Sequence, residues 1–177
     1  MTDAEILILP DVLPISNSNL RKDIQNELDN KTKPIGALGR LENLALHIGL
    51  ILGNENPELI QPQMLVCTAD HGLTAEGISA YPSDVTWQMV ENFLAGGAAV
   101  SVLSKQNNIS LNVVDCGVRH DFSPQEGLII QKVSKGTANS LYESAMSNDE
   151  CQQAINNGMN ITHSLEGNAL LLSLIHI

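Results

Sequence analysis

The sequence predicts an α/β fold with a mostly parallel sheet and a small helical subdomain at its amino-terminal end. Short apolar runs occupy 64–69, 109–115 and 128–133, another begins at 168, and helical periodicity follows the first and the third. Runs of this length are typical of strands that are covered on both faces. Strands that alternate with helices through short connections are typical of a parallel sheet.

The helical subdomain is expected to contain two helices. The first is indicated by apolar residues four positions apart, Leu20, Ile24 and Leu28. The second is expected to bury one apolar face, made by Leu41, Leu44, Ala45, Ile48 and Leu52. Gly53 is placed to end this helix. Because no strand is expected here, we assign 1–62 to a helical appendage and connector and 63–177 to the α/β domain.

Two helical segments are expected within the α/β domain. The first follows the strand at 64–69 and is expected to bury Val85, Met89, Val90, Phe93 and Leu94. Beyond a break at Gly96-Gly97, its apolar stripe continues through Val102 and Leu103. The second begins at Asn148, where acidic residues favour the positive end of the helix dipole. It is expected to bury Cys151, Ala154, Ile155 and Met159.

Composition excludes several classes of protein. Apolar residues make up 43% of the chain, which favours a globular protein over a disordered one. A net charge of -11 without a basic run argues against a nucleic-acid partner. The longest apolar stretch is too short to span a bilayer, so no membrane association is expected.

Cysteine usage predicts a cytoplasmic protein. The three cysteines are scattered without CxxC spacing, and the amino-terminal end lacks the pattern of a secretory signal. Cys67 and Cys116 fall within apolar strands and are therefore expected to be inert thiols in the core.

The stretch from 64 to 99 concentrates the unusual residues of the chain. It predicts a strand, a polar loop and a helix, and ligands of open α/β sheets bind outside the carboxyl ends of the strands. Asp70-His71-Gly72 at the strand end has two interpretations, a metal or phosphate site and a buried Asp–His pair that shapes the loop. The other histidines complete no recognisable ligand set, so we favour loop shaping and expect no metal.

Two other features of the chain, a group of aromatic residues and a pair of basic residues, each have more than one interpretation. Tyr81, Trp87 and Phe93 lie close together among only five aromatic residues. Such a group can stack on a flat ligand, although Phe93 is expected in the core and Trp87 equally suits a dimer surface. Lys33 and Arg40 flank a glycine-containing connector between the two helices. Their side chains either contact a phosphate or an acidic partner surface, or they are simply exposed to solvent.

Three segments in fixed order resemble one known family. They are KPIGALGRLE at 33–42, ADHGLTAEGISAYPSDVTWQMVENFLAGGAA at 69–99 and VVDCGV at 113–118. Together they resemble the nicotinate-nucleotide–dimethylbenzimidazole phosphoribosyltransferases, and Gly136-Thr137-Ala138-Asn139 and Ala145-Met146 resemble that family's next segment. The resemblance extends from about residue 20 to residue 172.

The resemblance implies a Rossmann-like domain, a homodimer and a pentosyltransferase. Phosphoribosyl would pass from nicotinate mononucleotide to 5,6-dimethylbenzimidazole, giving nicotinate and the α-ribazole 5'-phosphate used for the lower ligand of cobalamin. Neither a metal nor a cofactor is implied. A carboxylate would remove the proton of the attacking ring nitrogen as a general base.

The resemblance also assigns a benzimidazole pocket to the loop and helix after the first strand. Its expected substrate-binding residues are Ser79, Tyr81, Pro82, Val85, Gln88 and Met89. Some members have Ser at the position of Tyr81, so the preferred base can differ, and either Gln88 or Met89 matches the family's pocket glutamine.

The resemblance ends near residue 172. The family continues with a Gly-Glu-Met-Gly-Ile-Gly-Asn-Thr loop, whereas this chain has Ser173-Leu174-Ile175-His176-Ile177. The general-base Glu lies beyond this point in the family. We therefore expect an amino-terminal fragment with a truncated sheet, no catalytic residue and no activity of its own. The alternatives are a metal-dependent phosphohydrolase that uses Asp70 and His71, and a non-catalytic benzimidazole-binding module.

Overall fold

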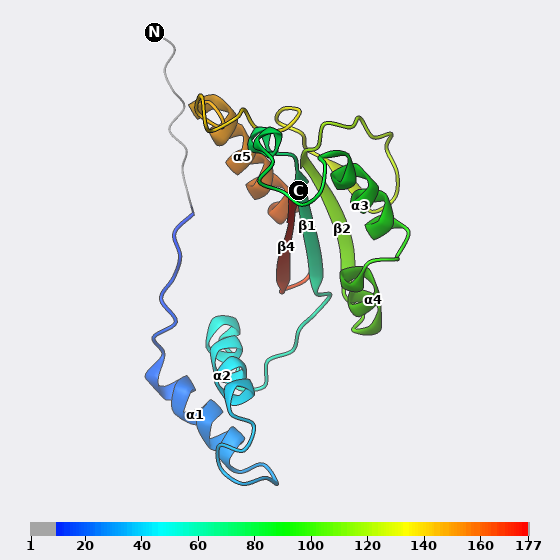
Figure 1. The fold of residues 1–177 in the computed structure, drawn as a ribbon. Coiled ribbons are helices and arrows are strands. Elements are labelled where there is room, and N and C mark those ends of the chain that lie inside the picture. Colours follow the sequence, from blue (N-terminus) through cyan, green and yellow to red (C-terminus); the bar gives the residue numbers. More distant parts are fainter. Residues whose placement is uncertain (1–9, 177) are drawn as a thin grey trace. The chain divides into compact units, whose positions relative to one another are not determined.

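The computed structural model describes residues 10–176, and the chain divides into two compact units, Met1–Glu58 and Leu59–Ile177. The first unit contains two helices, α1 (Ser18–Asp29) and α2 (Arg40–Leu52) (Figure 1). The Asn17 side chain caps α1 by accepting a hydrogen bond from the Leu20 N–H at 3.1 Å. Gly53 ends α2 in the left-handed region at a φ of 64°, as predicted.

The buried face of α2 differs from the predicted one. Leu41 and Leu44 are exposed, whereas Leu46 is buried against α1. Apolar residues occupy most of the circumference of this helix, so periodicity alone does not select a face. Gly49 lies on the buried face, where a Cβ would lie 2.6 Å from the Ile24 Cδ1 and 3.0 Å from the Asn54 carbonyl oxygen. The missing side chain allows α1 to pack closely at this point.

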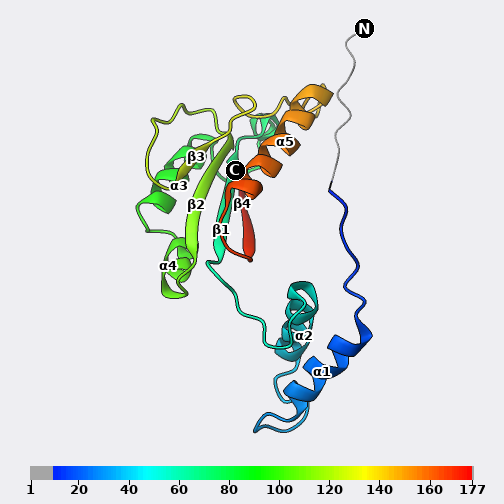
Figure 2. The same ribbon diagram turned by 180° about the vertical axis from the view of Figure 1, so that it is seen from behind.

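The second unit is built on a four-stranded parallel sheet in the order β3-β2-β1-β4. The strands are β1 (Gln63–Ala69), β2 (Ser110–Gly117), β3 (Leu128–Ile130) and β4 (Leu170–His176). The helices are η1 (Gly72–Glu76, a 3-10 helix), α3 (Asp84–Leu94), α4 (Ala99–Gln106) and α5 (Asn148–Ser164). Figures 1 and 2 show α3 and α4 on one face of the sheet and α5 on the other. The α/β fold is thus confirmed.

The strand order places a switch in direction beside β1. The chain runs from β1 to β2 and β3 on one side, then crosses over through α5 to β4 on the other side. At such a switch the connections leave the strands in opposite directions and open a crevice outside the carboxyl ends. The neighbourhood of Ala69 at the end of β1 is therefore the expected position of a ligand site.

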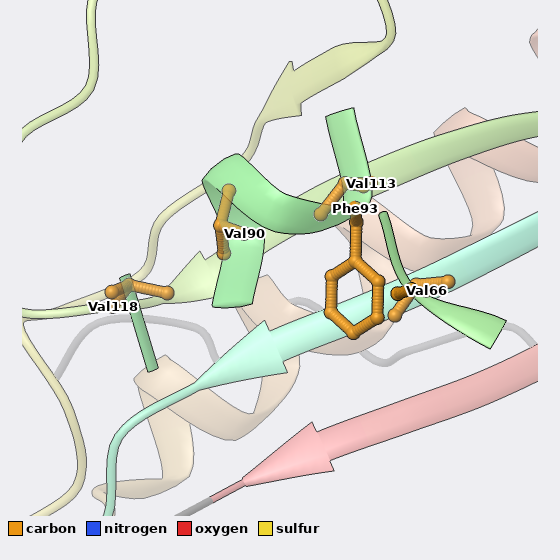
Figure 3. Packing of buried hydrophobic residues seen from close by; sticks show 6 residues of the cluster. Val66, Val90, Phe93, Val113 and Val118 are labelled. Atoms are coloured by element: carbon orange, nitrogen blue, oxygen red, sulfur yellow. The ribbon is translucent and has the colours of Figure 1, made fainter. Parts of the chain in front are cut away.

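The main core lies between the sheet and α3. Val66 and Val113 from the two central strands pack against Val90 and Phe93 of α3, and Val118 closes the cluster (Figure 3). This confirms the core position predicted for Phe93. On the opposite face, a smaller cluster joins the central strands to the carboxyl-terminal half of α5, with buried members Leu65, Val114 and Ile161.

The predicted apolar stripe does not continue along α4. Val102 and Leu103 are exposed, whereas Ser101 and Ser104 are buried. The Ser101 hydroxyl donates a hydrogen bond to the carbonyl of Phe93 at 2.9 Å. The buried side of α4 thus satisfies a carbonyl at the end of α3, and that task selects a hydroxyl over an apolar side chain.

The inward face predicted for α5 is also wrong. Cys151, Ala154 and Ile155 are exposed, and Met159 is half-buried. The helix is held against the sheet further along, where Ile161 packs on Leu65 and Val114. Its amino-terminal end is fixed by a capping box between Ser147 and Glu150 rather than by burial. No helix between residues 10 and 176 is long and apolar enough to cross a membrane.

Candidate active site at the carboxyl edge of the sheet

A cavity of about 840 Å³ opens at the carboxyl ends of β1, β2 and β4, where the strand order predicts a ligand site. Its lining is mostly apolar and comes from five segments: Cys67, Thr68 and Ala69; His71, Leu73, Thr74, Ile78 and Ser79; Cys116; Thr137, Ser140 and Ala145; and Leu174. The volume and the apolar lining suit a small organic ligand.

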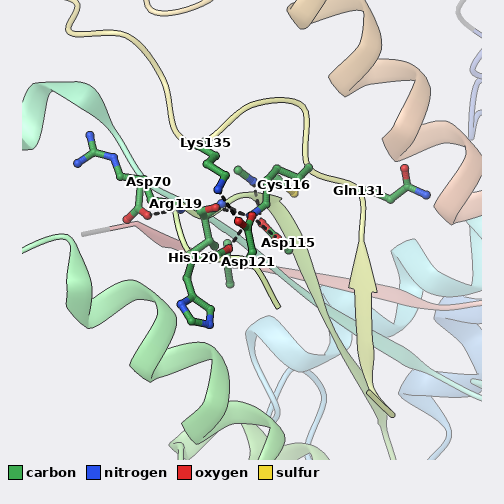
Figure 4. Close-up of polar contacts among 12 residues, drawn as sticks. Asp70, Asp115, Cys116, Arg119, His120, Asp121, Gln131 and Lys135 are labelled. Carbon is green, nitrogen blue, oxygen red and sulfur yellow. Dashed lines mark hydrogen bonds and ion pairs between the residues drawn. The ribbon is translucent and has the colours of Figure 1, made fainter. Parts of the chain in front are cut away.

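Asp70 organises the end of β1. Its buried carboxylate accepts a hydrogen bond from the Arg119 backbone N–H at 2.8 Å, and its carbonyl accepts one from the Thr137 N–H at 3.0 Å (Figure 4). Loop shaping, the interpretation favoured from the sequence, is what Asp70 does. His71 differs from that prediction, because it is half-buried and lies in the cavity wall.

Asp115 performs the same task at the end of β2. One carboxylate oxygen accepts the N–H groups of Gly117 and Val118 at 3.1 and 2.8 Å, and the other lies 3.3 Å from the Lys132 Nζ. The Lys132 ammonium also donates to the carbonyls of Val118 and His120 at 2.6 and 2.5 Å. Lys132 therefore compensates a buried charge and holds the turn after β2, a role that the sequence did not indicate.

The segment 134–147 closes one side of the cavity. The Thr137 hydroxyl accepts a hydrogen bond from the Gly72 N–H at 3.2 Å, and the Asn139 amide donates to the Glu76 carboxylate at 2.6 Å. A Cβ on Gly72 would lie 2.5 Å from the Ala138 carbonyl carbon, so only glycine permits this approach. No periodicity marks this segment, and only the resemblance of 136–139 to a family segment pointed to it.

Of the six predicted substrate-binding residues, Ser79 lines the cavity and its hydroxyl accepts the Tyr81 N–H at 3.2 Å. The other five lie on the adjoining loop and the first turns of α3. Tyr81, Pro82 and Gln88 are exposed, and Val85 and Met89 are half-buried. Met89 packs against the main core.

The aromatic side chain of Trp87 packs against other rings of this chain. The Trp87 ring stacks on His120 with centroids 5.0 Å apart, and His120 meets Phe122 edge-on at 4.9 Å. The sequence offered a ligand or a dimer surface as the partner of Trp87 and missed this stack. Tyr81 is not part of this stack and is 63% exposed.

The two strand cysteines are not inert core residues. Cys67 and Cys116 are half-buried and both line the cavity. The neighbouring Cys116 thiol holds the pKa of Cys67 at about 7, below the usual thiol range, although burial acts in the opposite direction. Apolar runs at the carboxyl ends of strands therefore do not guarantee burial, because the strand ends themselves form the cavity.

Comparison with known proteins now identifies the family. A family model described as "Phosphoribosyltransferase" matches residues 13–174. The chain belongs to this family. The phosphoribosyltransferase resemblance inferred from the sequence motifs is thereby confirmed, and a metal-dependent phosphohydrolase built on Asp70 and His71 is not supported. Within residues 10–176, no three His, Cys, Asp or Glu side chains are grouped as a metal site.

Similar proteins within the family carry one name. The chain is 59% identical over 172 residues to the nicotinate-nucleotide–dimethylbenzimidazole phosphoribosyltransferase of Variovorax paradoxus, covering 97% of this chain and 49% of that protein. It is 54% identical over 153 residues to the protein of that name from Dechloromonas aromatica, covering 86% of this chain and 44% of the relative.

A solved phosphoribosyltransferase shares the fold. The crystal structure of the enzyme of this name from Thermus thermophilus superposes with a TM-score of 0.81 at 36% identity, covering 91% of this chain and 50% of that one. The chain thus spans about half the length of the relatives it matches.

Replacing Lys132 tests the support beneath the site. The Lys132→Met variant leaves the buried Asp115 carboxylate without its cation, so we expect the free energy of unfolding to fall by about 3 kcal/mol. Lys135→Met is the matched control, because Lys135 pairs with the exposed Asp121 and is itself 58% exposed. Urea titration followed by circular dichroism measures both. Equal midpoints for the two variants would contradict a supporting role for Lys132.

Proposed function

We propose that the whole protein transfers phosphoribosyl from nicotinate mononucleotide to 5,6-dimethylbenzimidazole, giving α-ribazole 5'-phosphate and nicotinate. The observation that carries this proposal is the match of 97% of the chain, at 59% identity, to a protein named for that reaction. The cavity supports it independently, since a mostly apolar hollow of about 840 Å³ suits a flat benzimidazole.

In the proposed reaction, a ring nitrogen of the base attacks the anomeric carbon of the ribose while the bond to the nicotinate nitrogen breaks. The attacking nitrogen loses its proton to a general base. The task of this chain is to position the acceptor base, which supplies rate by holding the two reactants in line. The polar groups that face the cavity, among them Ser79 and Thr137, suit a positioning role.

We assign the acceptor side of the site to Ser79 and its neighbours. Ser79 contacts the base inside the cavity, and the adjoining residues form the outer part of the pocket: Tyr81, Pro82, Val85, Gln88 and Met89. Exposure of the Tyr81 ring leaves it able to stack on a flat ring at the mouth. No catalytic residue is assigned within this chain, because about half of each relative has no counterpart in it.

A homodimer is part of the same proposal. The face of α2 opposite Ile24 exposes large apolar side chains, with Leu41 at 63%, Leu44 at 55% and Ile51 at 65% exposure. The preceding connector adds Ile35 and Leu38 at 77% and 51%. Exposed large apolar side chains in such number favour association with a second copy.

A chimera tests the reaction. Residues 1–172 are fused to the remaining carboxyl-terminal part of the Variovorax relative, whose matched half is 59% identical. We expect nicotinate release from nicotinate mononucleotide that depends on added 5,6-dimethylbenzimidazole, and none from the isolated chain. A folded chimera that releases nicotinate at the same rate without the base would contradict the proposed reaction. Activity of the isolated chain would contradict its assigned role.

Filling the cavity tests the acceptor site. The isolated chain is titrated with 5,6-dimethylbenzimidazole by calorimetry and by the fluorescence of Trp87, the single tryptophan. Ser79→Phe places a ring in the cavity, so we expect binding to weaken at least about tenfold, or ~1.4 kcal/mol. Ser123→Phe, on an exposed loop outside the cavity lining, is the control and should bind as the unmodified chain does. Equal affinity in both variants would exclude Ser79 from the acceptor site.

Introducing a charge into the exposed face of α2 tests whether this face forms the dimer interface. In the full-length chimera, Leu44→Glu places a carboxylate in the exposed face of α2, and we expect light scattering to show a monomer where the unmodified chimera forms a dimer. Val102→Glu introduces the same charge on exposed α4 and should remain dimeric. A dimer that survives Leu44→Glu would place the interface elsewhere.

A further inference from the structure

Two thiols meet on one face of the sheet at the floor of the cavity. Cys67 lies on β1 opposite Val114, and the register shifts after Thr68, so that Ala69 pairs with Gly117. This irregularity leaves Cys116 between paired positions, on the same face as Cys67. Both cysteines also line a second cavity of about 280 Å³ beneath α5, so they sit where the two cavities adjoin.

The two thiols differ in electrostatics. The pKa of Cys67 is lowered to about 7 by its interaction with the neighbouring Cys116 thiol, so a large fraction is thiolate at neutral pH. The pKa of Cys116 is raised, first by its interaction with the Cys67 sulfur, then by burial and by the negative charge of Cys67. One sulfur is therefore a nucleophile, and the other is held protonated as long as Cys67 is a thiolate.

Few other charged groups face this pair. His71 is the titratable side chain in the cavity lining besides the cysteines, and Asp115 adds a small further rise to the pKa of Cys116. Near the thiols, α5 contributes uncharged residues, Ala154, Asn157, Gly158, Ile161 and Thr162, and β4 contributes leucines. The low pKa of Cys67 thus depends on Cys116 alone among its neighbours.

We propose that Cys67 and Cys116 form a thiol–disulfide exchange site that takes small-molecule disulfides of the glutathione type. The cavity gives a disulfide access to Cys67, and the adjacent position of Cys116 provides the second thiol. This modification site does not rest on the proposed transferase activity, because every group that it uses lies within residues 67–174.

The exchange proceeds in two balanced steps. The Cys67 thiolate attacks one sulfur of glutathione disulfide, so that a Cys67–glutathione disulfide forms and one glutathione thiolate leaves. Formation of this mixed disulfide removes the negative charge on Cys67. Cys116 then no longer has the interaction with the Cys67 thiolate or its charge, which are two of the causes that raise the pKa of Cys116. The Cys116 sulfur then loses its proton to water, attacks the Cys67 sulfur and expels the second glutathione as its thiolate. A Cys67–Cys116 disulfide remains, and a dithiol reductant reverses it.

Mass spectrometry tests the exchange in the full 177-residue chain. The Cys151→Ser variant removes the exposed third thiol and serves as the reference. With glutathione disulfide at neutral pH, we expect it to lose two hydrogens and both free thiols without retaining glutathione. Adding Cys116→Ala should trap one glutathione on Cys67, and adding Cys67→Ala should leave Cys116 unmodified. Glutathione that persists on Cys67 beside an intact Cys116, or equal reaction of Cys116 without Cys67, would overturn the proposal.

A pH profile supplies a second measurement. The rate of Cys67 alkylation by iodoacetamide in the Cys151→Ser variant should reach half its maximum near pH 7. Adding Cys116→Ala removes the thiol that lowers the pKa of Cys67, so we expect the midpoint to move to higher pH and the rate at pH 7 to fall several-fold. Circular dichroism confirms folding of each variant. An unchanged midpoint in the alanine variant would overturn the assigned role of Cys116.

Discussion

Two buried carboxylates that accept main-chain N–H groups hold the carboxyl edge of the sheet. Asp70 directly follows β1 and accepts the Arg119 N–H. Asp115 lies near the carboxyl end of β2 and accepts the N–H groups of Gly117 and Val118. Charge-assisted hydrogen bonds of this kind are stronger than neutral ones. These hydrogen bonds therefore fix the direction in which the backbone leaves β1 and β2. The cavity forms at the carboxyl ends of these strands.

The same constraint explains which parts of the site the sequence predicted. Strand ends and the Asp70-His71-Gly72 junction follow from local patterning, because an apolar run that stops at a polar residue marks its own position. Lys132 and Thr137 act through contacts to residues 14 and 65 positions away, and no local pattern encodes such partners. The fold class and the part of the cavity wall within 67–79 were thus predictable from local patterning, whereas the part contributed by Thr137, Ser140 and Ala145 was not.

The predicted buried faces of α2 and α4 were wrong for a related reason. Hydrophobic periodicity identifies the buried face of a helix only where polar residues occupy the opposite face. In α2, apolar residues occupy most of the circumference. The buried side of this helix contains Gly49, where a Cβ would lie 2.6 Å from the Ile24 Cδ1 and 3.0 Å from the Asn54 carbonyl oxygen. In α4 the buried residue Ser101 serves the carbonyl of Phe93, so hydrogen bonding outweighed hydrophobicity. The family resemblance succeeded because it compares order and spacing across whole segments.

The central claim is that the acceptor base binds in the cavity at the switch between β1 and β4. Backbone amide shifts of the ¹⁵N-labelled chain during titration with 5,6-dimethylbenzimidazole test it most directly. We expect the largest shifts in the residues around that cavity, at Ala69, Ser79 and Thr137, with a common saturation curve. Shifts confined to the cavity beneath α5, around Gly158 and Leu170, or to α2, would contradict it.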